Sequence, residues 1–404
     1  MSSQKSSREV VFKNQFPSAS EYHNLDAAAT GLLPESVAAF VYDYHLKSCV
    51  NAGRSAYRRS IEVTAMVDEA REKIASFLGT KKANLAFAPG ATHAINWIAK
   101  GLDLSAGDTV LCTMADHHAN ILPWLDLKRR GIRVVFAMCD GLGRIDVADF
   151  QDKVKGAKVA AFIAASNVTG AIQPMGELAK ISSENGAISV VDAAQLTPHQ
   201  RIDFDSLGVD FMAIAGHKMM ASKGSGLLLA RKSAQTLIGP LIVGGGSIKD
   251  VTTDSFELLP FPEGFESGTP SIEGILSLWK AIEWLLEQGE ENVWRHEKTL
   301  NKQAREILSQ VRGLKIYQPE NCTPTMSIEL SGWEPNKLAV KLDREYNIAI
   351  RSGHMCALPL VRDTMGFPKG LCRVSFGPWN EEEDVVAIAD ALNKISLEKH
   401  DGDF

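Results

Sequence analysis

Two polar residues follow apolar runs and have side chains that suit one cofactor. Asp192 ends the apolar run 188–191, and Lys218 follows Gly216 and His217 after the run 211–214. If both runs are strands of one sheet, the acid and the amine reach the same sheet edge. An amine holds an aldehyde as a Schiff base, and a carboxylate keeps a pyridine nitrogen protonated, so that substrate electrons drain into the ring. The pair predicts a pyridoxal phosphate site with His217 near the phosphate.

A lysine after a strand is more often a solvated surface residue, so the pair needs support from other motifs. Six motifs follow one another along the chain: DHHAN at 116–120, SNVTG at 166–170, DAAQ at 192–195, AGHK at 215–218, FESGTP at 265–270 and RSGHMCA at 351–357. In this order they resemble the class V aminotransferases, a family of fold-type I pyridoxal phosphate enzymes. Within that family they resemble the Suf-like (type II) cysteine desulfurases and the selenocysteine lyases. The resemblance extends from about residue 24 to about residue 395.

The resemblance implies an α/β fold, and the apolar runs agree with it. Strands are predicted at 85–88, 109–112, 133–137, 159–164, 188–191, 211–214 and 227–230. Most of these runs are apolar on both faces, as a mainly parallel sheet between layers of helices requires. A long helical stretch is expected over about 271–311, followed by a smaller α+β section with strands near 326–329, 348–350 and 373–376 and a final helix near 381–396.

We therefore expect three parts. Residues 1–24 form an N-terminal segment that packs on the small domain, as in the family. Residues 25–285 form a large domain that binds pyridoxal phosphate, with a mainly parallel seven-stranded sheet. Residues 286–404 form a small α+β domain that carries a cysteine loop.

A glycine turn that enters a helix supplies donors for a phosphate. In the run 87–96, Gly90, Ala91 and Thr92 come where the free amides of the helix favour an anion. Without the resemblance, this segment is an ordinary strand-to-helix turn capped by Thr92. The resemblance favours the phosphate site, and it implies that Thr269 reaches the phosphate of a neighbouring subunit, which makes the active unit a homodimer.

The resemblance also assigns residues to the cofactor ring and to the substrate. His117 stacks on the pyridine ring, while His118 is open to a structural role. Gln195 and Asn167 hydrogen-bond the ring hydroxyl or lie beside the substrate, although both residue types are also common in turns at strand ends.

A substrate carboxylate calls for a guanidinium, which can bind it through two parallel hydrogen bonds. Arg373 matches the family's carboxylate-binding arginine, and Arg351 is a second candidate. For either arginine the alternative is a surface ion pair.

The six cysteines show neither a C-x-x-C pair nor metal-ligand spacing, so neither a disulfide framework nor a metal site is predicted. Cys112, Cys139 and Cys372 lie in or beside apolar runs and are expected to be buried. Cys356 instead follows the run 348–351 in a loop with Gly, His and Pro, a setting that can expose a thiol near positive charge.

The resemblance implies that L-cysteine is converted to L-alanine, that Lys218 takes the Cα proton and that Cys356 carries a persulfide. The sulfur then passes to an acceptor protein for iron–sulfur cluster assembly or other sulfur transfer. Selenocysteine lyase activity on L-selenocysteine would use the same site.

Two other classes of protein are alternatives. Another class V aminotransferase or a β-eliminating lyase would keep Lys218, Asp192 and His117 without needing the thiol. A non-enzymatic assembly protein would have no reason to keep Lys218, Asp192 and Arg373 together.

Several positions depart from the family pattern. Ala215 stands where relatives often have a phosphate-binding serine, and Ala91 where they often have threonine. Each lost neutral hydrogen bond typically costs about 1 kcal/mol. Met355 replaces a histidine beside the cysteine, and near Arg54 the expected histidines are Gly53 and Tyr57, which puts the acid–base roles of those histidines in doubt.

Composition is ordinary for a globular protein. The chain has 404 residues with 45% hydrophobic and 23% charged residues, enough for a large core. A net charge of −6 gives no support for binding to nucleic acid or to a membrane through a basic patch. Residues 1–8 are polar and lack an apolar targeting core, and no run reaches membrane-spanning length, so a cytoplasmic location is predicted.

Overall fold

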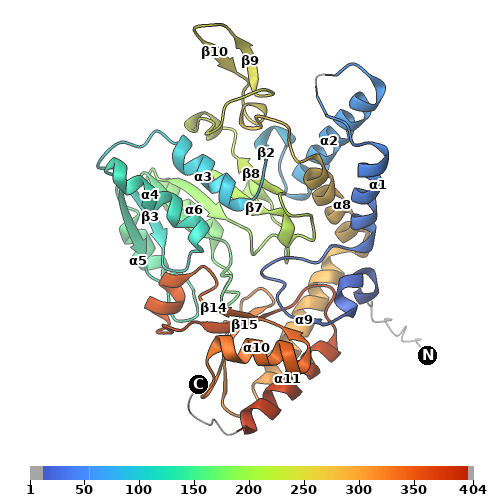
Figure 1. Ribbon diagram of the computed structural model, residues 1–404. Helices are drawn as coiled ribbons and strands as arrows, with labels where there is room; N and C mark the ends of the chain where they lie inside the picture. Colours follow the sequence, from blue (N-terminus) through green and yellow to red (C-terminus); the bar gives the residue numbers. More distant parts are fainter. Residues whose placement is uncertain (1–11, 54, 399–404) are drawn as a thin grey trace, which may run out of the picture.

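The computed structural model describes residues 12–53 and 55–398. Its central feature is a seven-stranded sheet (Figure 1). The strands are β2 Leu85–Ala88, β3 Thr109–Thr113, β4 Arg133–Ala137, β5 Val159–Ile163, β6 Ile188–Asp192, β7 Phe211–Ala215 and β8 Gly226–Ala230. In the order β2-β8-β7-β6-β5-β3-β4, the five strands from β7 to β4 are parallel, and β8 is antiparallel to both of its neighbours. The predicted fold class is confirmed.

Helices cover both faces of this sheet. Successive residues of a strand point to opposite faces, so that in β7 Met212 and Ile214 enter one apolar core while Phe211 and Ala213 enter the other. The first core includes residues of α2 Arg58–Phe77, α6 Met175–Glu184 and α8 Ile272–Gln288, and the second includes residues of α3 Ala91–Gly101 and α4 Leu122–Asp126. The remaining described α-helices before β8 are α1 Glu35–Lys47, α5 Val147–Lys153 and α7 Phe204–Leu207.

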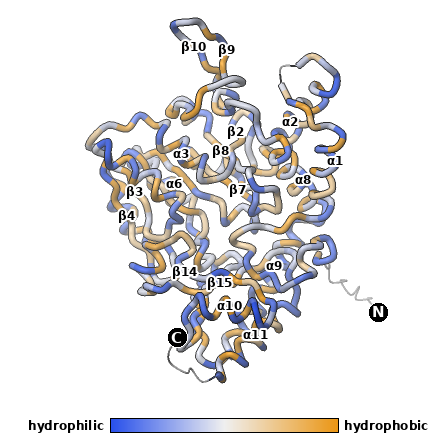
Figure 2. Tube along the Cα trace, viewed as in Figure 1, coloured by the Kyte–Doolittle hydropathy of each residue, from blue (hydrophilic) through white to orange (hydrophobic). Residues whose placement is uncertain are grey.

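A second, antiparallel sheet lies in the C-terminal part of the chain. Its order is β11-β12-β15-β14, from β11 Leu314–Tyr317, β12 Thr325–Leu330, β14 Arg351–Gly353 and β15 Leu371–Ser375. Its apolar core includes residues of α9 Glu290–Leu308, α10 Pro335–Tyr346 and α11 Glu382–Leu397. Figure 2 shows hydrophilic and hydrophobic residues mixed along α10 and α11, as expected for helices with one buried face.

Two expectations for this part need correction. The helical stretch predicted over 271–311 is interrupted at Gly289, whose φ of 76° lies in the left-handed region, so α8 and α9 are separate helices. The predicted strand at 348–350 is divided as well. Its first half, β13 Ile348–Ala349, pairs in parallel with β1 His23–Asn24, and the chain then enters β14.

The described part of the N-terminal segment packs on the C-terminal half of the chain. The ring of Phe16 contacts Trp284 of α8 and Trp379, and His23 is 2.6 Å from the carboxylate of Asp384 in α11. Residues 1–11 and Arg54 lie outside the described residues. The expected domain boundary between residues 285 and 286 falls in the last turn of α8, and the division into domains stays a prediction.

A hairpin of β9 Ile248–Val251 and β10 Phe256–Leu258 projects from the body of the molecule (Figure 1). The side chains of Val251 and Phe256 on this hairpin are exposed. Among the described helices, none combines the length and the apolar character that crossing a bilayer requires.

Candidate active site

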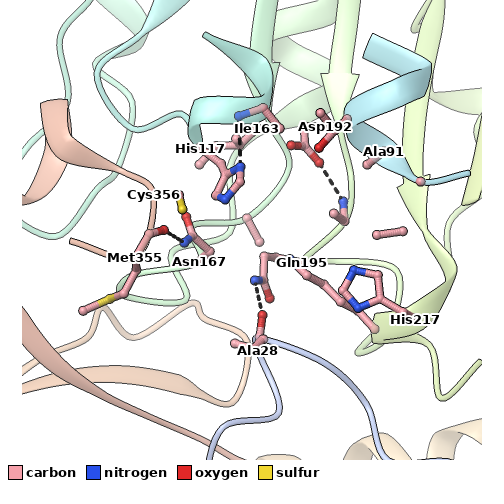
Figure 3. A pocket seen from close by; sticks show the side chains of 18 of the residues that line it. Ala28, Ala91, His117, Ile163, Asn167, Asp192, Gln195, His217, Met355 and Cys356 are labelled. Atoms are coloured by element: carbon pink, nitrogen blue, oxygen red, sulfur yellow. Dashed lines mark hydrogen bonds between the residues drawn. The ribbon is translucent and has the colours of Figure 1, made fainter. Parts of the chain in front are cut away.

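A cavity of about 600 Å³ lies at the carboxyl ends of the parallel strands. Turns after β3, β5, β6 and β7 line it together with the start of α3, the cysteine loop and β15. The predicted site residues that line it are Gly90, Ala91, Thr92, His117, Asn167, Asp192, Gln195, His217, Lys218, Arg351, Cys356 and Arg373. Thr269 does not line it. The topology therefore brings together residues that are far apart in the sequence (Figure 3).

Asp192 and Lys218 come from adjacent parallel strands. Asp192 is the last residue of β6, and Lys218 ends a one-turn helix that follows β7. Burial raises the pKa of Asp192, while a hydrogen bond from the Ala194 amide at 3.0 Å and the nearby Lys218 act in the opposite direction. Burial lowers the pKa of Lys218 to about 8, although Asp192 favours the charged amine. An amine with this pKa is neutral often enough near pH 7 to act as a nucleophile or a base.

His117 lies on a turn after β3. Its Nδ1 accepts a hydrogen bond from the Ala119 amide at 3.0 Å, which leaves the ring proton on Nε2. Burial, and after it Lys218, lowers the pKa of His117 to about 3. The ring is therefore a neutral, flat surface that lines the same cavity as Asp192 and Asn167 (Figure 3).

The start of α3 is left open to a ligand. The N-cap position of α3 is Gly90, which has no side chain, and no side chain caps the helix. The alternative, a turn capped by Thr92, is therefore not observed. The first amides of α3 have no partner within the helix and suit an anion. His217 lines the same cavity, with Nδ1 at 3.2 Å from the Thr30 hydroxyl. Burial, and then Lys218, lowers the pKa of His217 to about 4.

Two side-chain amides connect the cavity to other segments. Gln195 donates from Nε2 to the Ala28 carbonyl at 2.8 Å, and Asn167 donates from Nδ2 to the Met355 carbonyl at 2.6 Å (Figure 3). The Oδ1 atom of Asn167 is buried without a hydrogen-bond partner among the described residues. An unsatisfied buried acceptor is costly, and a ligand donor would satisfy it.

The two candidate arginines share one carboxylate. Arg373 is buried and donates to the Asn167 carbonyl at 2.9 Å and to Asp26 Oδ1 at 2.7 Å. Arg351 is half exposed and lies 2.9 Å from Asp26 Oδ2. The Nε atom of Arg373 is buried without a partner among the described residues. Asp26 was not predicted, and no local signal indicates it, because it pairs with Arg373 from 347 positions away.

Cys356 is exposed, whereas Cys112, Cys139 and Cys372 are buried as predicted. Burial raises the pKa of all three buried thiols, and the pKa of Cys139 and of Cys372 reaches about 12. Cys356 lies in the same cavity as Lys218 and Arg373, and it interacts electrostatically with both. It is thus the cysteine best placed to react in this cavity.

The described residues contain no cluster of histidine, cysteine or acidic side chains that could hold a metal ion.

The residues that depart from the family pattern lie partly inside and partly outside the cavity. Ala91, Ala215 and Met355 line the cavity, so the missing side-chain donors concern the site itself. Gly53 and Tyr57 do not line it; the Gly53 amide donates to Thr64 Oγ1 at 2.7 Å, and Tyr57 is exposed.

These residues fit pyridoxal phosphate. The cavity volume is within the range of small-molecule sites, and both a lysine with a lowered pKa and a buried carboxylate line it. Asn167 Oδ1 and Arg373 Nε, which are buried without a partner among the described residues, are also available to hydrogen-bond a ligand.

The family model of the class V aminotransferases matches residues 23–388. The chain belongs to this family. Class V aminotransferases use pyridoxal phosphate and have the fold-type I architecture, so the expected cofactor and fold are both confirmed.

Similar proteins agree over nearly the whole chain. A probable cysteine desulfurase of Pyrococcus abyssi is 34% identical over 390 residues, which cover 95% of this chain and 96% of that protein. One of Methanothermobacter thermautotrophicus is 31% identical over 95% of this chain and 97% of that protein. Among solved structures, the apo cysteine desulfurase of Thermococcus onnurineus superposes with a TM-score of 0.92 at 32% identity, covering 98% of this chain and 99% of that one. The Escherichia coli cysteine desulfurase CsdA gives a TM-score of 0.88 at 29% identity, covering 96% and 97% of the two chains.

Proposed function

We propose that this class V aminotransferase family member is a cysteine desulfurase that converts L-cysteine to L-alanine and keeps the sulfur as a persulfide on Cys356. The observation that carries the proposal is the position of Cys356, an exposed thiol in one cavity with Lys218 and the buried Arg373. Aminotransferases and eliminating lyases need the lysine and the arginine but have no use for the thiol.

Different residues around the cavity would bind different parts of the cofactor. Lys218 would hold it covalently, Asp192 would face the pyridine nitrogen and His117 the ring. The amides of Gly90, Ala91 and Thr92 and the side chain of His217 would hold the phosphate, with Gln195 and Asn167 at the ring hydroxyl or the substrate. The bound cofactor supplies an electron sink for the bonds at the substrate Cα.

The substrate side relies on the two arginines. Arg373 would bind the carboxylate of L-cysteine through a guanidinium that Asp26 and the Asn167 carbonyl hold in place. Arg351, tied to the same Asp26, would add positive charge at the entrance. Lys218, with a pKa lowered to about 8, would take the Cα proton and return it.

The thiolate of Cys356 would then attack the substrate sulfur. An S–S bond forms and the Cβ–S bond breaks; the electron pair stays with the carbon skeleton, which takes up a proton to become L-alanine. Arg373 and Lys218 line the same cavity and place positive charge near this thiol. Because Cys356 is exposed, the persulfide can pass its sulfur to an acceptor protein for iron–sulfur cluster assembly or other sulfur transfer.

We also propose a homodimer. Thr269 is exposed and lines a different cavity, of about 370 Å³, together with Ile242. The neighbouring residues Leu241, Ile242 and Val243 expose apolar side chains, which a second copy of the chain would cover. In such a dimer Thr269 would reach the phosphate in the partner's cavity. A cytoplasmic location remains a prediction from the sequence.

The test is to supply L-cysteine to the cofactor-loaded protein and to measure L-alanine and protein-bound persulfide. The wild type should form both, and Cys356→Ser should form neither while still binding L-cysteine, with a change in the cofactor absorbance. Cys49→Ser is the matched control, because Cys49 is also exposed but does not line the cavity. L-Alanine release at the wild-type rate by Cys356→Ser, or a persulfide on Cys112, Cys139 or Cys372, would overturn the proposal. L-Selenocysteine, whose selenium leaves more readily, serves as the alternative substrate.

A further inference from the structure

The cysteine loop has an unusual backbone. Met355 and Cys356 have φ values of 51° and 55°, so two consecutive residues other than glycine adopt the left-handed conformation. Side chains disfavour this region, and such residues keep it only where the surrounding structure holds them. Contacts outside the loop must therefore fix the direction of the Cys356 side chain.

Three hydrogen bonds join this loop to turns of the large sheet. The main-chain amide of His118 donates to the Cys356 carbonyl at 2.7 Å, and Asn167 Nδ2 donates to the Met355 carbonyl at 2.6 Å. The Leu358 amide donates to His118 Nε2 at 3.2 Å. His118 thus contacts the loop on both sides of Ala357, once through its backbone and once through its ring.

We propose that His118 is a positioning residue for the nucleophile, because its imidazole holds the cysteine loop in the strained conformation that directs the Cys356 thiol into the cavity. The inference rests on the proposed function for its meaning in catalysis. His118 follows His117 directly, so one turn after β3 would place both the ring-contacting histidine and the thiol.

The turn that carries His118 is itself fixed. Asp116 is fully buried and accepts from the Thr113 amide at 2.8 Å, the Thr113 hydroxyl at 2.7 Å and Asn120 Nδ2 at 2.8 Å. His354, the other histidine near the thiol, bonds instead to the Pro368 carbonyl in the C-terminal part of the chain at 3.0 Å, so it does not connect the loop to the large sheet.

The bond to Leu358 requires an unprotonated Nε2 on His118. Burial, and after it His354, lowers the pKa of His118, which favours the neutral ring that can accept this bond.

The test compares His118→Leu and His118→Gln in the cofactor-loaded protein. Leucine removes the acceptor, while the Oε1 atom of glutamine can replace it, and the main-chain bond to Cys356 remains in both. His118→Phe, which keeps a flat ring without an acceptor, is used if the leucine variant does not fold. His45→Leu, on α1 away from the cavity, is the matched control.

Hydrogen exchange of the Leu358 amide, followed by mass spectrometry, is the first readout. The loss of one neutral hydrogen bond corresponds to about a fivefold faster exchange, which we expect for leucine but not for glutamine or the control. Turnover of L-cysteine should fall by a similar factor in the leucine variant at nearly unchanged KM, and it should recover in the glutamine variant.

Unchanged exchange at Leu358 in the leucine variant would overturn the inference. Equal loss of turnover in the leucine and glutamine variants would also overturn it, because it would indicate a chemical role for the imidazole. If the wild type forms no L-alanine from L-cysteine, the proposed function fails, but the exchange comparison still decides whether His118 holds the loop.

Discussion

The lowered pKa of Lys218 should control the pH at which the protein captures pyridoxal phosphate. Only the neutral amine attacks an aldehyde. With a pKa of about 8 for Lys218, about one molecule in ten carries the neutral amine at pH 7, compared with about one in 2,500 for an ordinary lysine. The site thus raises the reactive fraction about 200-fold at neutral pH.

The assay is the initial rate of the absorbance change when cofactor-free protein is mixed with pyridoxal phosphate between pH 7 and pH 10. We expect the rate to rise about fivefold from pH 7 to pH 8 and only about twofold from pH 8 to pH 10. A lysine with an ordinary pKa would give a rise of about 70-fold over the second interval, and that result would refute the reasoning.

A second variant tests the sign of the charge effect on Lys218. Asp192 favours the charged amine, so Asp192→Asn should lower the pKa of Lys218 further and move the plateau of the capture rate to lower pH. Asp254→Asn, in the exposed turn of the hairpin, is the control and should leave the profile unchanged. A shift of the Asp192→Asn profile to higher pH would contradict the assignment of this pair.

Three further predictions concern the same site. The loaded protein should be yellow, Lys218→Ala should lack the absorbance band of the protein–cofactor Schiff base, and borohydride reduction followed by peptide mapping should place the cofactor on Lys218; another lysine would make the site assignment wrong. Sedimentation at micromolar concentration should give the mass of a dimer, whereas a monomer with full cofactor occupancy would exclude a shared site at Thr269. Asp26→Asn, which leaves the buried Arg373 charge without its carboxylate and releases Arg351, should raise the KM for L-cysteine at least several-fold with a smaller change in kcat, and an unchanged KM would show that this bridge does not order the arginines.

The seven strands of the large sheet could be predicted because they are short apolar runs, most of them apolar on both faces, which distinguishes them from the helical stretches by length and composition. Strand β11 was missed, because Leu314–Tyr317 alternates apolar and polar residues on a partly exposed edge and does not form an apolar run. The interruption at Gly289 was also missed, since a glycine within a helical pattern does not by itself show whether the helix ends.

Residues at strand ends, such as Asp192 and Lys218, could be predicted to meet because the carboxyl ends of parallel strands share one edge of the sheet. Asp26 could not, because nothing near it in the sequence reveals the distant arginines that it pairs with. The interaction of His118 with the cysteine loop also depends on tertiary contacts across 240 positions. The sequence shows these residues but does not reveal which distant residues they contact.

The contacts of the main chain help to explain how the site accommodates its departures from the family pattern. At position 355, where the family resemblance implies a histidine, the Met355 side chain takes no part in the bond from Asn167, which goes to the backbone carbonyl. Ala91 is the first residue of α3, where the backbone amides rather than a side-chain hydroxyl would face an anion. Main-chain groups would therefore hold the loop and bind a phosphate whichever side chains occupy positions 355 and 91. The acid–base work that Met355 cannot do would fall to Lys218, which lies in the same cavity with a pKa of about 8.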